Sequence, residues 1–138
     1  MSVRGAIVAA ATVAIMVVLH FDEAEAAAIN YVVGNEKGVT SVYGWTANSP
    51  SVDYYPSSFD LNRGDTLQFI YNKDVHNVVG VGQNRYDTCN GSKGTEYTGG
   101  NNTIMLKPGM NYFICTKPGN STGNMCKAYT MKIKVNAN

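Results

Sequence analysis

Few side chains in this sequence are suited to chemistry: three cysteines, Cys89, Cys115 and Cys126, and two histidines, His20 and His76. A thiol and an imidazole can bind a transition metal together, or they can act as nucleophile and base. Residues 113–126 read FICTKPGNSTGNMC, with two of the cysteines, a Pro-Gly pair and no histidine. Any site built around these cysteines must therefore take its imidazole from elsewhere in the chain.

The N-terminal residues predict a secretory signal peptide over residues 1–26. Arg4 gives a short basic start, and residues 5–19 form an uninterrupted run of 15 apolar or small residues, which is too short to span a bilayer comfortably. Small-x-small patterns at 24–26 and 26–28 predict cleavage after Ala26 or Ala28. Export would also remove His20, so His76 becomes the single histidine of the mature chain.

The mature chain, residues 27–138, has about 110 residues, the size of one domain with one core. Removing Arg4, Asp22, Glu23 and Glu25 changes the formal count from 11 basic and 10 acidic residues to 10 and 7, a net charge of +3. The basic residues are spread along the chain, which makes nucleic acid a poor candidate partner. An acidic polysaccharide or an acidic protein face fits better, although a solvated surface explains the charge equally well.

Three further expectations concern covalent and quaternary organisation. Secretion favours disulfides, but three cysteines cannot all pair within one chain, so one thiol is left over. The chain stops directly after its last apolar run, and we expect no membrane anchor. We also expect a monomer.

Short runs rich in β-branched and aromatic residues, separated by Gly, Pro and Asn turns, predict the elements that must position these side chains. The predicted strands cover residues 31–33, 66–71, 76–81, 103–106, 111–115 and 131–135. No segment of comparable length shows the spacing of an amphipathic helix, although a short helix could sit within residues 34–60. Many short strands of this kind predict an all-β sandwich or barrel.

Several short motifs occur in a specific order along the mature chain. They are Tyr31-Val32-Val33-Gly34, Gly44-Trp45-Thr46, Gly64-Asp65, His76-Asn77-Val78-Val79, Tyr86-Asp87-Thr88-Cys89-Asn90, Tyr112-Phe113-Ile114-Cys115 and Met131-Lys132-Ile133. As an ordered set that spans nearly all of residues 27–138, they resemble the phytocyanins, the secreted plant blue-copper proteins, and most closely the plantacyanin or basic blue protein branch. The resemblance implies a cupredoxin-like Greek-key β-sandwich with one disulfide.

The resemblance also implies a set of metal ligands. In that family a histidine that follows one strand, and then Cys, His and Met from a C-terminal loop, hold one copper ion. The thiolate and two imidazoles form a trigonal plane around the ion, and the thioether lies on its axis. By resemblance, His76 is the first ligand, Cys115 the thiolate and Met131 the axial sulfur. Cys89 and Cys126 would form the family's disulfide, which leaves Cys115 as the unpaired thiol.

The chain departs from the family at the second imidazole. Where the family's loop reads Cys, two residues, Pro-Gly-His, this chain has Asn120 in the place of the histidine. An insertion of roughly residues 121–125 then precedes Cys126, and the spacing from Cys126 to Met131 is one residue longer than the family's. An amide oxygen is a hard, weak donor for copper, so weak copper binding or none is expected.

Three functions follow, in order of preference. The first is a copper-poor phytocyanin domain that acts as an extracellular interaction or signalling module, with a protein or a cell-wall polysaccharide as partner. The second is a functional plantacyanin-type copper electron carrier. The third, an enzyme with Cys115 as nucleophile and His76 as base, is the weakest, because two residues of suitable types are far commoner than a working dyad. We therefore expect no enzymatic activity.

Two motifs have both a functional and an ordinary interpretation. Asn90, Asn101 and Asn120 each begin an N-glycosylation sequon, and a glycan on Asn120 would cover the edge through which a family member passes its electron. Sequons also arise by chance in loops rich in Asn and Ser. Residues 63–65 spell the adhesion tripeptide Arg-Gly-Asp, but a turn before a strand uses Gly and Asp for its own reasons.

Overall fold

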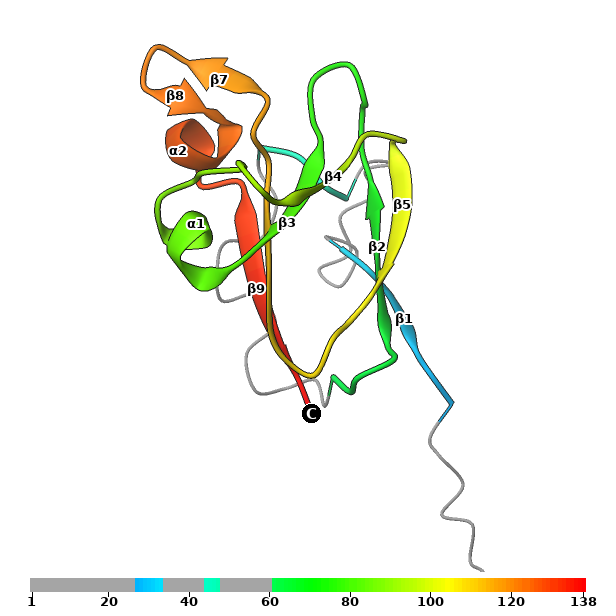
Figure 1. Ribbon diagram of the computed structural model, residues 1–138. Helices are drawn as coiled ribbons and strands as arrows, with labels where there is room; N and C mark the ends of the chain where they lie inside the picture. The colour runs from blue at the N-terminus through cyan, green and yellow to red at the C-terminus, as the bar shows by residue number, and fades with distance from the viewer. Residues whose placement is uncertain (1–26, 34–43, 48–60) are drawn as a thin grey trace, which may run out of the picture.

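The computed structural model describes residues 27–33, 44–47 and 61–138, and these form a sandwich of two β-sheets (Figure 1). The predicted signal peptide, residues 1–26, lies outside the described residues, as does the candidate helix region apart from residues 44–47. Neither prediction is therefore tested by the fold. Among the described residues, no helix is long and apolar enough to cross a membrane.

The two main sheets have three and four described strands. The first has the order β1-β2-β5, with β1 (Asn30–Val32) parallel to β2 (Thr66–Ile70) and β5 (Asn101–Met105) antiparallel to β2. The second has the order β4-β3-β6-β9, all antiparallel, with β3 (Val78–Val81), β4 (Thr95–Tyr97), β6 (Gly109–Ile114) and β9 (Lys132–Ala137). The connections from β2 to β3, β4 to β5 and β5 to β6 pass between sheets, as in Greek-key sandwiches.

The hydrophobic core lies between the two sheets because alternate residues of each strand face inward. Leu67 and Phe69 of β2 are fully buried, as are Ile133 and Val135 of β9. Trp45 is also fully buried and stands edge-on to Phe69, with 5.2 Å between the ring centroids. The sequence-based prediction of an all-β sandwich, with Trp45 in its core, is confirmed.

Each predicted strand corresponds to an observed one within a few residues at either end, but several short elements were not predicted. They are β4, the hairpin of β7 (Pro118–Asn120) and β8 (Gly123–Asn124), and the helices α1 (Gln83–Asp87) and α2 (Met125–Tyr129). Elements of two to five residues are too short to show a period in the sequence. The expectation of strands without helices was therefore wrong in these two places.

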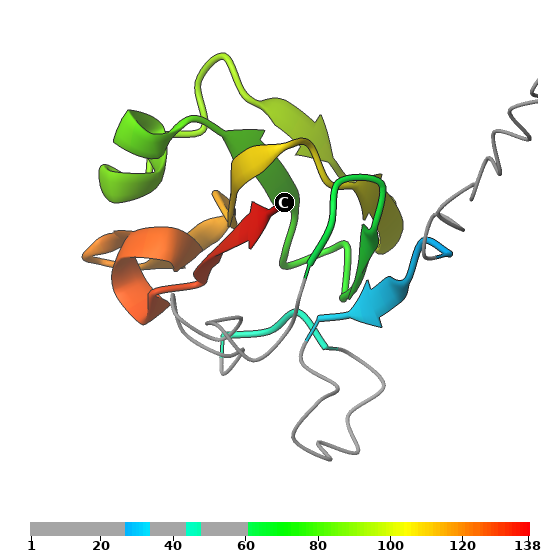
Figure 2. The same cartoon turned by 90° about the horizontal axis from the view of Figure 1, so that it is seen from below.

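The two helices lie on the same side of the molecule, next to the sheet that contains β6 and β9 (Figures 1 and 2). A disulfide joins Cys89, two residues after α1, to Cys126 in α2, with 5.6 Å between the Cα atoms. Asn124 caps α2 by accepting from Lys127 N–H, and its amide donates to the Cys89 carbonyl. The predicted pairing of Cys89 with Cys126 is confirmed.

The turn before β2 depends on the buried carboxylate of Asp65. Its two oxygens accept the N–H groups of Ile29 and Asn62, each at 2.9 Å, and its carbonyl accepts Leu106 N–H at 2.8 Å. Gly64 has a φ of +89°, which a glycine adopts without strain. The Arg-Gly-Asp tripeptide thus carries an acidic residue that is only 3% exposed and is committed to the fold.

Replacing Asp65 with Ala should lower the free energy of unfolding by about 3 kcal/mol, because two buried N–H groups lose a charged acceptor. Urea unfolding followed by circular dichroism measures the loss. The matched control is Asp74→Ala in an exposed turn, which should change stability by no more than about 0.5 kcal/mol. Equal losses in the two variants would contradict a structural role for the Asp65 carboxylate.

Candidate metal centre

His76 and Cys115 meet at one end of the sandwich although 39 residues separate them in sequence. His76 lies in the loop between β2 and β3, and Cys115 directly follows β6. The Nδ1 atom of His76 is 3.8 Å from the Sγ atom of Cys115. Cys115 is free and fully buried, which confirms the expected unpaired thiol, whereas His76 is half-buried.

This separation fits two donors that share one metal ion. With bonds of about 2.0 Å to imidazole nitrogen and about 2.3 Å to thiolate sulfur, as at zinc, two donors at about 120° lie roughly 3.7 Å apart. A trigonal thiolate–imidazole arrangement is the one that copper uses in electron-transfer sites. His76 and Cys115 therefore fit two of the three in-plane positions of such a site.

Asn77 fixes the geometry of this pair by joining the two loops that carry it. Its side-chain oxygen accepts Thr116 N–H at 2.8 Å, and its amide nitrogen donates to the Thr116 hydroxyl at 2.9 Å. Its backbone carbonyl accepts the indole N–H of Trp45 at 2.8 Å. Asn77 is only 2% exposed, so the residues adjacent to His76 and Cys115 are held together in the interior.

Met131, the predicted axial ligand, is 1% exposed and belongs to the same core cluster as Cys115. The Cys115 N–H group donates to the Met131 carbonyl at 3.0 Å, so the two backbones run side by side. The extra residue between Cys126 and Met131 is absorbed at the end of α2, where Thr130 adopts a left-handed conformation with a φ of +54°. Met131 thus reaches the interior despite the altered spacing.

Burial sets the protonation states of the pair. It raises the pKa of the Cys115 thiol, although the backbone N–H groups of Asn77 and Lys117 act in the opposite direction. Burial also lowers the pKa of the His76 imidazole. At neutral pH both shifts favour a neutral thiol beside a neutral imidazole. A thiol that is neutral and inaccessible to solvent is a poor nucleophile, which weighs against the dyad considered above.

Asn120 does not join this group of side chains. It ends β7 in the hairpin formed by residues 118–124 and is exposed to solvent. Its side-chain oxygen accepts the backbone N–H of Thr122 at 2.8 Å and also the Thr122 hydroxyl. The residue that the sequence places at the histidine position is therefore engaged in its own turn at the surface. Asn90 and Asn101, the other two sequon residues, are also exposed.

Sequence reasoning missed Met125. This residue is 7% exposed and belongs to the core cluster that contains Cys115 and Met131. The signal that could have found it is its place directly before Cys126, because the point at which an insertion enters a loop is ambiguous. An insertion placed before Met125 leaves Met125, not Asn120, next to the disulfide cysteine. Within the described residues, no group of three or more His, Cys, Asp or Glu side chains could hold a metal, so any site must use methionine sulfur.

A two-sheet β-sandwich with a buried thiol beside an imidazole at one end defines the cupredoxin class, and comparisons with known proteins agree. The family model of the Plastocyanin-like domain matches residues 45–126. The basic blue protein of Cucumis sativus is 41% identical, over 78% of this chain and 97% of the relative. The chemocyanin of Lilium longiflorum is 35% identical, over 84% and 86%.

Solved structures give the same result. The cucumber basic protein, a blue copper protein, aligns with a TM-score of 0.62 and 38% identity, over 79% of this chain and 99% of that protein. Spinach plantacyanin aligns with a TM-score of 0.59 and 32% identity over the same shares. The chain belongs to the phytocyanin family. Membership implies copper as the family's cofactor, whereas the ligand roles of His76, Cys115 and Met131 stay predictions.

The thiol count and its reactivity can be checked together. Unfolded protein should release one thiol per chain to a disulfide reagent such as DTNB, because Cys89 and Cys126 are paired. In the native state at about pH 7, Cys115 should react at least roughly tenfold more slowly than a small thiol, since it is buried and its pKa is raised. The rate should increase as the pH rises, because more thiolate forms. Two or more thiols, or native labelling as fast as a free thiol, would contradict the structure.

Proposed function

We propose that this domain is an extracellular binding module on the phytocyanin scaffold, and that it does not form the family's blue Cu(II) centre. The observation that carries the proposal is the position of Asn120, exposed in a hairpin and bonded to Thr122. His76 is then the single imidazole beside Cys115. An extracellular location is supported by the predicted signal peptide and by the disulfide, because disulfides persist in oxidising compartments.

The missing imidazole weakens the site for Cu(II) in particular. Imidazole nitrogen suits copper, whereas an amide oxygen is a poor substitute. Changes to groups that merely support a metal ligand commonly cost tenfold to a hundredfold in affinity. Loss of a direct ligand should cost more than that. The His76 and Cys115 pair alone would hold Cu(II) weakly and without the trigonal plane of a blue site.

Secreted protein titrated with Cu(II) should therefore stay colourless. An intact blue site would give an intense thiolate-to-copper charge-transfer band in the visible spectrum, and none is expected here. The cucumber basic protein, prepared and titrated in the same way, serves as the positive control. A strong visible band that saturates at one copper per chain would contradict the proposal.

Electron transfer is the second candidate function, and one observation favours it. The 3.8 Å separation of His76 Nδ1 and Cys115 Sγ fits two donors of a trigonal copper site, and Met131 lies buried beside them. Several relatives are also named blue copper proteins. A band in the Cu(II) titration, followed by reversible reduction at an electrode, would support this function in place of the first.

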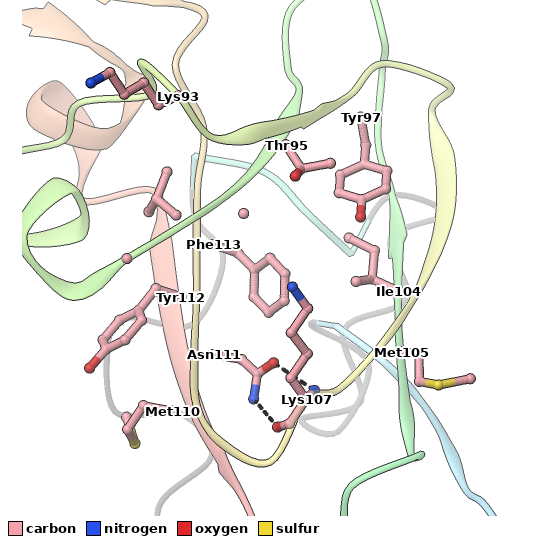
Figure 3. A pocket seen from close by; sticks show the side chains of 13 residues that line it. Lys93, Thr95, Tyr97, Ile104, Met105, Lys107, Met110, Asn111, Tyr112 and Phe113 are labelled. Atoms are coloured by element: carbon pink, nitrogen blue, oxygen red, sulfur yellow. Dashed lines mark hydrogen bonds between the residues drawn. The ribbon is translucent and has the colours of Figure 1, made fainter.

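A pocket of about 320 Å³ supports the binding role (Figure 3). It lies where β3, β4 and β6 of one sheet meet β5 of the other, and Figure 3 shows the rings of Tyr97 and Phe113 among its lining side chains. Lys93, from the loop before β4, and Lys107, from the loop between β5 and β6, also line it. None of the described residues that line the pocket is acidic.

The position of Lys107 is fixed by its neighbour Asn111. The Asn111 side chain accepts Lys107 N–H at 2.9 Å and donates to the Lys107 carbonyl at 2.8 Å, as the dashed lines in Figure 3 mark. A fixed backbone reduces the entropy that a ligand must offset on binding. Two cations beside aromatic rings suit a sugar ring that bears a carboxylate. The proposed ligand is therefore an acidic polysaccharide of uronate units.

Polygalacturonate is a suitable probe, and its binding can be followed by NMR shifts of amides at the pocket. Lys107→Gln should weaken binding about fivefold, the effect of one partly screened charge pair. Lys134→Gln is the matched control, because Lys134 lies on β9 and does not line the pocket. Added salt should also weaken binding. Equal effects of the two substitutions would indicate attraction to the overall charge and contradict a role for the pocket.

A further inference from the structure

We infer that Met125 takes the second ligand position of the metal centre. His76, Cys115, Met125 and Met131 then form a set of one nitrogen and three sulfur donors, which selects Cu(I) over Cu(II). The inference rests on the proposed function in one respect, namely that the native protein has no blue Cu(II) centre. It goes beyond that proposal by naming the ligand and the copper oxidation state that the altered loop accepts.

The first step of the argument is the way the loop closes. Met125 N–H donates to the Lys117 carbonyl at 2.8 Å, and Cys126 N–H donates to the Cys115 carbonyl at 2.9 Å. The chain therefore returns beside Cys115 and Lys117 after residues 118–124 have made their hairpin. The hairpin is an excursion from the loop, and Met125 is the first residue after it. Close packing supports this arrangement, because a Cβ on Gly119 would lie 2.8 Å from Ala128 Cβ of α2.

The second step is the hydrogen bonding among the sulfur-bearing residues. Cys115 N–H donates to the Met131 carbonyl at 3.0 Å, and Met131 N–H donates to the Met125 carbonyl at 3.3 Å. The three residues are thus adjacent along a continuous set of backbone hydrogen bonds. All three side chains are buried in one core cluster, and Cys115 also contacts the His76 ring. Asn120 has none of these bonds and is exposed.

The third step is the chemistry of the donors. Thiolate and thioether sulfur are soft ligands and select Cu(I), whereas a blue Cu(II) plane uses two imidazoles. When Cu(I) binds, the Cys115 thiol releases its proton to solvent, and the thiolate and the ion together carry no net charge. With Cu(II) the same donors would leave one positive charge in the interior, which costs free energy on burial. Burial and ligand type therefore favour the same oxidation state.

The position of the second ligand is tested by a pair of histidine substitutions. Met125→His should give an intense charge-transfer band with Cu(II), because it supplies the missing imidazole at the position beside Cys115. Asn120→His should stay colourless, since residue 120 lies in the exposed hairpin. A blue Asn120→His variant together with a colourless, folded Met125→His variant would overturn the inference.

The preference for Cu(I) is tested on the native sequence. With ascorbate present and oxygen excluded, competition against bicinchoninate should show one Cu(I) bound per chain, and X-ray absorption should show three sulfur neighbours. Met125→Leu should weaken Cu(I) binding at least about tenfold while keeping the fold, because Leu and Met have similar volumes. The control is Met110→Leu, an exposed methionine that should leave the affinity unchanged.

These measurements separate failure of the inference from failure of the proposed function. If native protein turns blue with Cu(II), the proposed function fails and this inference fails with it. If native protein stays colourless and Met125→Leu binds Cu(I) as tightly as the native sequence, the inference alone fails. Met125 would then be a core residue that fills space, and the proposed function would stand.

Discussion

The contact between two loops through Asn77 is the constraint on which the functional end of this protein depends. One buried amide joins the backbone after His76 to the backbone after Cys115, and the indole of Trp45 holds it from the core. Because these loops are 39 residues apart, no local preference could bring the imidazole to the thiol. A buried polar side chain with both ends hydrogen-bonded gives such a contact one well-defined geometry.

The insertion in the C-terminal loop shows how a family scaffold accommodates extra residues. The added segment forms its own hairpin, β7 and β8, and packs against α2, while the disulfide and the backbone bonds of Cys115 and Met131 persist. Long insertions at a surface cost little entropy, so the sandwich core is unaffected. The consequence falls on the metal centre, where the insertion decides which side chain follows the hairpin and enters the interior.

Much of the fold was predictable, because alternation and turn residues mark the longer strands. The parallel pairing of β1 with β2, however, and the five-residue helices left no sequence period to recognise. The site was predictable in part: His76, Cys115 and Met131 follow from the ordered motifs. Met125 was not, because counting residues from Cys115 along the loop assumes that each inserted residue lies after Asn120.

The amino-acid sequence by itself determined the composition of the site. A mature chain with one histidine and one unpaired cysteine cannot supply two imidazoles, whatever its fold. Only the tertiary structure decided which residues surround that cysteine. Hydrogen bonds from Met125 to Lys117 and from Cys126 to Cys115 exclude the hairpin from the loop, so Asn120 lies in solvent and Met125 in the core. The reason is that spatial neighbours are set by backbone pairing across the loop, which residue spacing alone does not encode.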